Sequence, residues 1–351
     1  MFLEFFNLRE QPFGVSPDPR FLYLGPGHRE ALASLYYGIE ANRGFLSLVA
    51  RPGMGKTTLL FHLLAKFSHT ARTAFIFQTQ CNSREFMRFL LAEIGIENEV
   101  NDFVRMHEQF NRCLVQEARA GRRFIVVIDE AQNLDASVLE TVRLLSDFET
   151  PQAKLLQIIL VGQPSLADKL ATPGLTQLRQ RITSLSGLSP LTPQETACFI
   201  EHRLKVAGHT GASLFSAEAL YLIAEASEGI PRQINNYCFH SLSLACATRQ
   251  RVVDTDIVEE VLNDLDISRF LSEVETPASM SRLVSTGVVN PDSISESDDQ
   301  VVEKRTAAPK SVLSSRKVSK DSLSPAEAVQ HMRDVTRLLN NWRSGVEHPS
   351  D

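Results

Sequence analysis

One short stretch limits the possible folds of this chain more than any other. Residues 50–57 read Ala-Arg-Pro-Gly-Met-Gly-Lys-Thr, directly after the apolar run Phe45–Ala50 and before the helical pattern Thr58–Phe67. A glycine-containing loop between a strand and a helix is the setting of a P-loop, whose backbone N–H groups surround phosphate oxygens. The positive end of the following helix dipole strengthens such a site. The stretch therefore predicts a nucleotide phosphate site on an α/β sheet.

The residues of this loop have separate expected roles. Gly53 and Gly55 let the backbone curl, Lys56 reaches the β- and γ-phosphates, and the Thr57 hydroxyl is offered to Mg²⁺. Ala50 replaces the usual first glycine, a mild change at a position that mainly needs a small residue. The expected cofactors are ATP and Mg²⁺. The expected nucleotide-binding residues of this segment are Ala50, Arg51, Pro52, Gly53, Met54, Gly55, Lys56, Thr57 and Thr58.

A second motif turns this loop from a plausible turn into a predicted catalytic site. Phe124–Asp129 is an apolar strand that ends in an acid, and Glu130 follows it. An all-apolar run is typical of a strand buried on both faces, and ligands bind at the carboxyl ends of such strands. We expect Asp129, with Thr57, to hold Mg²⁺, and Glu130 to polarise the attacking water as general base. The two motifs together predict ATP hydrolysis.

The pattern around these motifs defines the fold class. Short apolar runs alternate with stretches of helical periodicity, which predicts a largely parallel sheet with helices on both faces. We assign this α/β P-loop NTPase core to residues 28–188, beginning with a helix at 28–42. The predicted strands are Phe45–Ala50, Thr73–Thr79, Phe124–Asp129, Leu155–Val161 and Ile182–Leu185, and predicted helices include Thr58–Phe67, Ser83–Ile94 and Val138–Phe148.

Two further regions flank the predicted core. Residues 1–27 are rich in proline and aromatic residues, so we expect an extended segment whose rings pack on the next domain. Residues 189–266 contain no good strand and predict a small all-helical lid domain. Its expected helices are 193–207, 217–227, 231–248 and 254–265, with start signals at Thr192-Pro193, Ser216, Pro231 and Asp254.

The last part of the chain changes in composition. Residues 267–324 are dominated by serine, charge and isolated prolines, which predicts a disordered linker. Residues 325–343 regain an apolar helical stripe that includes Met332 and Trp342. We expect this short amphipathic helix to dock on a partner, because isolated helices of this length are marginal in water. The alternative is a weakly folded terminal helix without a partner.

Charge and hydropathy narrow the location and the partners. The net charge of −6 over 351 residues argues against a surface that coats nucleic acid as a whole, although a local basic patch stays possible. The N-terminus lacks the pattern of a signal peptide, and no window approaches the roughly 18 apolar residues of a spanning helix. We expect a cytoplasmic protein that reaches the inner membrane, if at all, peripherally through a partner.

The ordered set of motifs resembles the AAA+ ATPases. Besides the two nucleotide motifs it comprises FFNLREQPFGVSPDPRFLYL, LLQIILVGQPSL, LTQLRQRI and GIPRQINNYC. More narrowly, residues 1–265 resemble the general secretion pathway protein A family and its ATPase relatives at polysaccharide-export and protein-sorting loci. The resemblance implies a homo-oligomeric ATPase, a motor or switch that acts with a protein partner in an envelope secretion, export or assembly system.

The resemblance also implies roles for four more polar residues. Gln163 matches the sensor 1 position, and Arg232, after Gly229-Ile-Pro231, matches sensor 2 at the start of a lid helix. Arg179 or Arg181 matches an arginine finger that reaches the neighbouring subunit's site, with Arg181 slightly favoured. For each of them, a plain polar or surface role is the alternative.

The aromatic lead-in resembles the segment of this family that packs beside adenine. On that basis Phe13 and Leu24 are the expected adenine contacts. Two other functions stay open. One is a nucleotide-gated, DNA-binding adaptor of the transposition type, against which the net acidity counts. The other is a scaffold whose tail helix around Trp342 tethers a partner, a role compatible with ATP hydrolysis.

Overall fold

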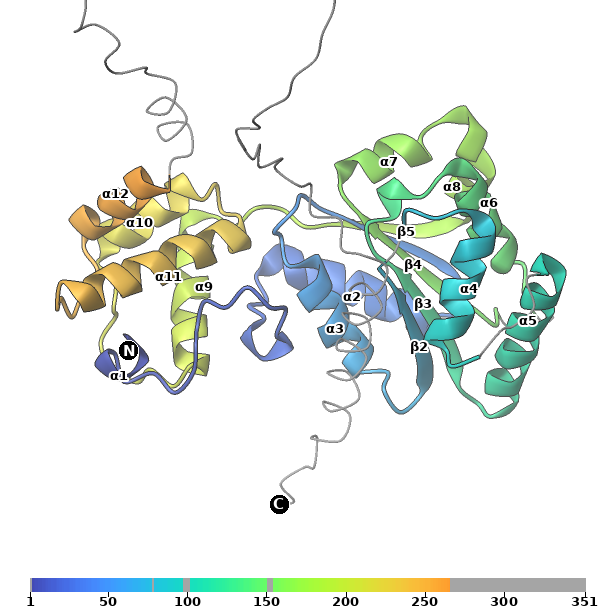
Figure 1. The fold of residues 1–351 in the computed structure, drawn as a ribbon, viewed down its shortest axis with the longest axis horizontal. Coiled ribbons are helices and arrows are strands. Elements are labelled where there is room, and N and C mark those ends of the chain that lie inside the picture. Colours follow the sequence, from blue (N-terminus) through green and yellow to red (C-terminus); the bar gives the residue numbers. More distant parts are fainter. Residues whose placement is uncertain (1, 78, 97–101, 150–153, 266–351) are drawn as a thin grey trace, which may run out of the picture. The chain divides into compact units, whose positions relative to one another are not determined.

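The computed structural model describes residues 2–77, 79–96, 102–149 and 154–265 (Figure 1). Nearly all of the sequence motifs discussed above fall within these ranges. The predicted linker at 267–324 and the predicted helix at 325–343 lie outside the described residues.

The central element is a five-stranded sheet in the order β2-β3-β4-β1-β5, with every neighbouring pair parallel. The predicted parallel sheet is therefore confirmed. The bounds of the strands differ from the prediction by at most three residues: β2 starts and ends earlier than expected, β4 starts two residues later, and β5 continues to Gly187. The strands are β1 (Phe45–Val49), β2 (Ala71–Ile76), β3 (Arg123–Ile128), β4 (Gln157–Gly162) and β5 (Ile182–Gly187).

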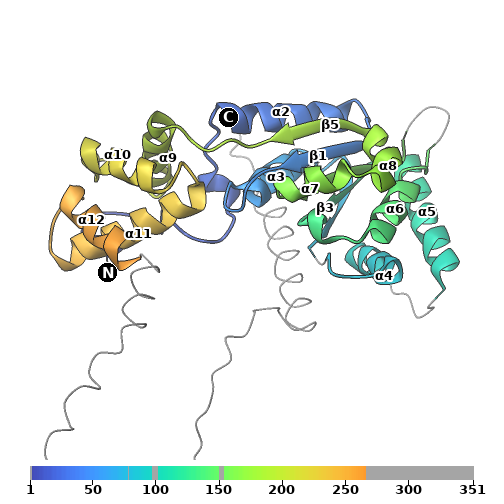
Figure 2. The same cartoon turned by 90° about the horizontal axis from the view of Figure 1, so that it is seen from above.

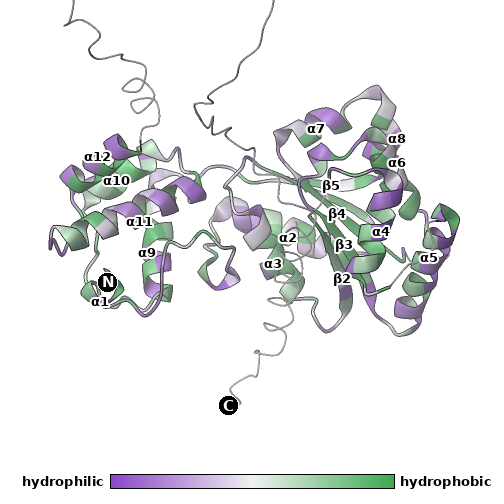
Figure 3. Cartoon of the chain, viewed as in Figure 1, coloured by the Kyte–Doolittle hydropathy of each residue, from purple (hydrophilic) through white to green (hydrophobic). Residues whose placement is uncertain are grey.

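Helices cover both faces of this sheet (Figure 2). Helices α2 (Pro26–Glu40) and α3 (Lys56–Ala65) pack on one face, and alternate residues of β3, Ile125 and Val127, point into their core. Phe124, Val126 and Ile128 point into the opposite core. The central strands are accordingly mostly hydrophobic (Figure 3), as expected of strands buried on both faces. The helices of the opposite face are α4 (Ser83–Glu93), α5 (Phe103–Arg119), α6 (Ala136–Leu145), α7 (Pro164–Leu170) and α8 (Thr176–Arg181).

Helix α5 is not among the helices predicted from the sequence. Its buried residues include Met106, Phe110 and Leu114, spaced four apart, and Asp102 caps its first turn by accepting a hydrogen bond from the backbone N–H of Val104. Most of its other positions are polar, so its apolar stripe is narrow.

The chain after the sheet forms a helical domain, in agreement with the predicted lid. Three of its helix starts are capped by the residues that signalled them, and one of these is Asp254, which accepts from the backbone N–H of Ile257 at 3.2 Å. Thr192 forms a capping box with Glu195, and Ser216 accepts from the backbone N–H of Ala219. The helices are α9 (Pro193–Val206), α10 (Ala217–Ala226), α11 (Pro231–Ala247) and α12 (Thr255–Asp264).

The N-terminal segment differs from the prediction in where its rings lie. It contains two short helices, α1 (Phe2–Phe5) and η1 (Pro19–Phe21). Its rings Phe6, Phe13 and Phe21 are buried in the core of the helical domain rather than on the ATPase core.

Contacts of Arg203, on α9, help to explain why these rings are buried in the helical domain. Arg203 donates from Nε to the Pro12 carbonyl at 2.5 Å, and its guanidinium lies 4.9 Å from the centre of the Phe21 ring. Leu22 and Leu24, by contrast, pack against the α2–α3 core. The segment is thus shared between the two domains.

Candidate nucleotide-binding site

The loop from β1 to α3 has the backbone that the sequence predicts. Gly53 and Gly55 have φ values of +81° and +82°, in the left-handed region that other residues avoid. The backbone N–H of Ala50 donates to the Gly162 carbonyl at 3.1 Å and ties the start of the loop to the end of β4. The loop therefore lies at the carboxyl edge of the sheet, where ligands of open α/β folds bind.

Lys56 is folded into this loop. Its Nζ donates to the carbonyls of Ala50 and Arg51 at 3.0 and 3.3 Å. Burial lowers the pKa of Lys56, while the charges of Glu130 and Asp129 act in the opposite direction. The arrangement places a buried ammonium group at the centre of a loop suited to phosphate.

Asp129 and Thr57 meet across this edge of the sheet. The Thr57 hydroxyl donates to Asp129 Oδ2 at 3.1 Å, and the Glu130 backbone N–H donates to Oδ1 at 2.9 Å. Burial raises the pKa of Asp129, a tendency that a nearby cation would oppose. A hydroxyl and a carboxylate oxygen are hard donors of the kind that Mg²⁺ prefers, so the two residues fit such an ion.

Glu130 has an unusual backbone and two amide partners. Its φ of +52° is in the left-handed region, uncommon for a non-glycine residue. Its Oε2 accepts hydrogen bonds from Nε2 of Gln132 at 2.6 Å and from Nε2 of Gln163 at 3.1 Å. Because β4 lies between β3 and β1, the sheet order itself brings Gln163 next to Glu130 and the P-loop.

A pocket of about 430 Å³ is lined both by these groups and by residues of the helical domain. It is lined by P-loop residues 52–58, by Glu130 and Gln163, by N-terminal residues 14–18 and 21–23, and by lid residues that include Arg203 and Arg232. Ala50 and Arg51 do not line it. The Arg51 side chain instead forms an exposed ion pair with Glu228 at 3.5 Å.

The expected adenine contacts lie elsewhere. Neither Phe13 nor Leu24 lines the pocket. Phe13 packs edge-on against Phe215 in the helical core, with ring centres 6.4 Å apart, because that core offers full burial to an apolar ring. Phe21 and Tyr23 of the same segment do line the pocket. The segment identified by the resemblance is therefore at the site, but through other side chains.

Arg232 lies at the start of a lid helix, beside the P-loop, and a contact of His28 with the same loop is an addition to the predicted site. The Arg232 backbone N–H donates to the Gly53 carbonyl at 3.1 Å, and the side chain lines the pocket. His28, in the first turn of α2, is buried below the loop and donates from Nε2 to the Met54 carbonyl at 3.1 Å. Burial lowers the pKa of His28. No local sequence signal indicates this contact, since it joins residues 26 positions apart.

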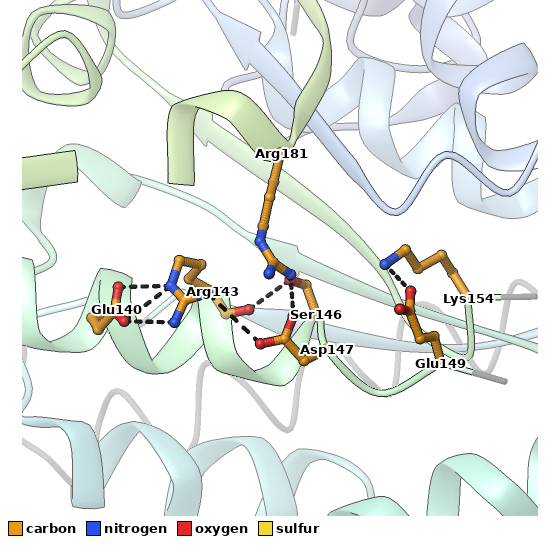
Figure 4. Close-up of polar contacts among 7 residues, drawn as sticks. All are labelled: Glu140, Arg143, Ser146, Asp147, Glu149, Lys154 and Arg181. Carbon is orange, nitrogen blue, oxygen red and sulfur yellow. Dashed lines mark hydrogen bonds and ion pairs between the residues drawn. The ribbon is translucent and has the colours of Figure 1, made fainter. Parts of the chain in front are cut away.

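The structure separates the two candidate finger arginines. Arg181 is partly buried, donates to Ser146 Oγ at 2.8 Å and pairs with Asp147 (Figure 4). Asp147 is also 3.7 Å from Arg143, so Arg181 belongs to a charge cluster within its own chain. Arg179 is exposed, and its side chain has no hydrogen bond or ion pair to any residue in the described part of the chain. Of the two candidates, Arg179 is therefore the one whose side chain has no partner among the described residues.

Comparison with known proteins agrees with this geometry. Residues 39–170 match the family model of the AAA domain. With its parallel sheet, P-loop and helical lid, the chain has the fold of the AAA+ P-loop proteins.

Among individual proteins, the chain resembles general secretion pathway protein A of Aeromonas hydrophila. The two are 36% identical over 298 residues, which cover 82% of this chain and 53% of that protein. The chain thus spans about half the length of this relative.

Two further similarities are more distant. An uncharacterised HTH-type transcriptional regulator of Methanocaldococcus jannaschii is 27% identical over 68% of this chain and 66% of its own length. The ORC2 protein of Aeropyrum pernix, solved in ADPNP–ADP complexes, superposes with a TM-score of 0.58 at 17% identity, over 73% of this chain and 71% of that one. The likeness to ORC2 shows the fold alone.

No helix in the described ranges combines the length and the apolar character needed to cross a lipid bilayer.

Proposed function

We propose that this chain binds ATP with Mg²⁺ and hydrolyses it. The observation that carries the proposal is the convergence of Lys56, Glu130 and Gln163 on one pocket, with Thr57 Oγ1 and Asp129 Oδ2 3.1 Å apart at its edge. A basic group at the phosphates, a cation site and a group that orients or activates the water are the components that recur in sites for phosphoryl transfer to water.

Each of the four central residues of the proposed site then has a defined role. The Lys56 ammonium exchanges the carbonyls of Ala50 and Arg51 for phosphate oxygens when nucleotide binds. Thr57 and Asp129 hold Mg²⁺, which supplies charge neutralisation at the phosphates when it is bound. Glu130 accepts the proton of the attacking water.

Three more residues complete the proposed site. Gln163 orients the water or the γ-phosphate from the end of β4, and Arg232 contacts the γ-phosphate from the lid. Arg179, exposed and unpaired among the described residues, reaches a neighbouring subunit's nucleotide. This assignment requires a homo-oligomer in which one subunit completes the site of the next.

We further propose that the ATPase is a motor or switch in an envelope secretion, export or assembly system, with a protein partner. The similarity to general secretion pathway protein A supports this role. The tail helix expected at 325–343 is a candidate tether for the partner, and a peripheral place at the inner membrane through that partner follows from the same role.

The proposal is tested by steady-state ATP turnover of the wild-type chain beside the Lys56→Ala and Glu130→Gln variants. We expect Lys56→Ala to lose nucleotide binding and Glu130→Gln to bind ATP without turnover. Affinity recovery with Glu130→Gln held in ATP then enriches the partner of the ATP-bound form. Wild-type turnover by Glu130→Gln would contradict the mechanism.

A further inference from the structure

The side chain of Gln132 joins the proposed catalytic base to the end of the neighbouring strand. Its Nε2 donates to Glu130 Oε2 at 2.6 Å, and its Oε1 accepts from the backbone N–H of Gln163 at 3.1 Å. The orientation of the amide is therefore fixed, because only the oxygen can accept from a backbone N–H. Gln132 lies beside the base, yet it does not line the nucleotide pocket, whereas Glu130 and Gln163 do.

The backbone around Gln132 is fixed as well. Lys169 of α7 donates from Nζ to the carbonyls of Gln132 and Leu134 at 2.6 and 2.7 Å, which holds the short η2 helix (Ala131–Asn133). The opposite side of the amide is filled by the end of β4. A Cβ added to Gly162 would lie only 2.7 Å from Gln132 Oε1, so the glycine makes room for this contact.

The two amides leave one carboxylate oxygen of Glu130 free. Both Gln132 and Gln163 donate to Oε2, and no side chain or backbone group in the described part of the chain donates to Oε1. A carboxylate held by one oxygen has a defined direction for the lone pairs of the other. Glu130 itself starts from a left-handed backbone, at φ +52°, that needs such support.

We propose that Gln132 is a positioning residue that holds Glu130 by Oε2 and directs Oε1 toward the attacking water. The inference rests on the proposed ATPase function. In that reaction the water oxygen bonds to the γ-phosphorus while its proton passes to Glu130 Oε1. The bond from the γ-phosphorus to the bridging oxygen breaks, and its electron pair leaves on ADP. Gln132 does not line the nucleotide pocket, so it acts through the groups that it holds, chiefly Glu130.

The variant Gln132→Met tests this role, because methionine has nearly the same length and volume without the amide. We expect kcat to fall by roughly 10- to 100-fold, as misdirection of a catalytic group does, with the Kd for Mg·ATP within about twofold of wild type. The matched control is Gln250→Met, at an exposed position after α11, which should leave kcat, Kd and Tm unchanged.

A double-mutant cycle separates positioning from structural support. In the Glu130→Gln background, Gln132→Met should cause no further loss of single-turnover rate, because the group it directs is already gone. Equal losses in both backgrounds, or parallel losses of Tm and ATP affinity, would show a structural role and overturn the inference.

Gln132→Asn is the second variant and guards against failure of Gln132→Met to fold. It keeps an amide one methylene shorter, so we expect a reduced kcat with ATP affinity retained. Wild-type kcat in either folded variant overturns the inference while leaving the ATPase proposal intact. Absence of turnover in the wild-type chain would instead contradict the ATPase proposal itself.

Discussion

The carbonyl of Gly53 accepts a hydrogen bond from the backbone N–H of Arg232 at 3.1 Å, so the P-loop and the first turn of α11 are in direct backbone contact. The approach is close enough that a Cβ on Gly53 would lie 2.8 Å from the Cβ of Arg232. A change of the Gly53 backbone therefore acts directly on the first turn of α11.

We expect Gly53→Ala to weaken both the fold and ATP binding. Alanine at φ +81° is strained, and its methyl group overlaps the start of α11. The free energy of unfolding should fall by about 1–3 kcal/mol, and ATP affinity should drop at least tenfold. Urea denaturation and nucleotide titration measure the two effects. Gly174→Ala is the control, since nothing lies within 4 Å of its added Cβ; equal behaviour of the two variants would contradict the contact.

Phe13 is expected to support the helical domain rather than adenine. Its side chain is only 3% exposed in the core of that domain, so Phe13→Ala should lower the free energy of unfolding by about 3–5 kcal/mol. Tyr37→Ala removes an aromatic ring that is 69% exposed and should cost far less. Weakened ATP binding by a Phe13→Ala protein of wild-type stability would restore the adenine role.

The sequence predicted the parts of the molecule that depend on local patterns. Strand–helix alternation, the glycine pair of the P-loop and the acid-terminated β3 are each readable within a few residues, and the fold class followed from them. The sheet order then brought Asp129 and Gln163 to the loop, as the rule for carboxyl ends of parallel strands requires.

What the sequence missed depends on contacts between distant segments. The aromatic rings of the N-terminal segment pack in a core formed by residues about 190 positions later in the sequence. The hydrogen bond from Arg203 to Pro12, for example, joins residues 191 positions apart. The difference between Arg179 and Arg181 depends on the ion pair of Arg181 with Asp147, which lies 34 positions away in the sequence. Composition and periodicity carry no information about such pairs.

The two arginines should respond differently to substitution. Arg179→Ala should preserve ATP binding and stability but lower the turnover of the oligomer by roughly 10³-fold or more, and mixing with wild-type subunits should show a dominant effect. Arg181→Ala should instead destabilise the chain by up to about 1 kcal/mol through loss of the Asp147 pair. ATP turnover and urea denaturation of both variants test this assignment. Loss of turnover in Arg181→Ala alone would identify Arg181, and not Arg179, as the arginine finger.

Stability should fall on acidification through His28. Burial lowers the pKa of His28 below its ordinary value of 6.5. The unfolded chain then binds more protons than the folded chain once the pH drops below about 6.5, so the free energy of unfolding decreases there, by at most about 1.4 kcal/mol per pH unit.

Replacement of His28 by glutamine should reduce this pH dependence, because glutamine keeps a donor for the Met54 carbonyl but does not titrate. Burial also lowers the pKa of His62, His107 and His202, so part of the dependence should remain. Urea denaturation at pH 7.5 and 5.5 measures the change. The exposed His69→Gln serves as control, and an identical pH dependence in wild type and His28→Gln would refute the prediction.

The most direct test of the ATPase account is Mg²⁺-dependent release of phosphate from ATP by the wild-type chain and by Glu130→Gln, with ATP binding measured in parallel. The account predicts turnover in the wild type, and a loss of at least about 10²-fold in Glu130→Gln at unchanged ATP affinity. Binding without hydrolysis by the wild type, or undiminished hydrolysis by Glu130→Gln, would contradict it.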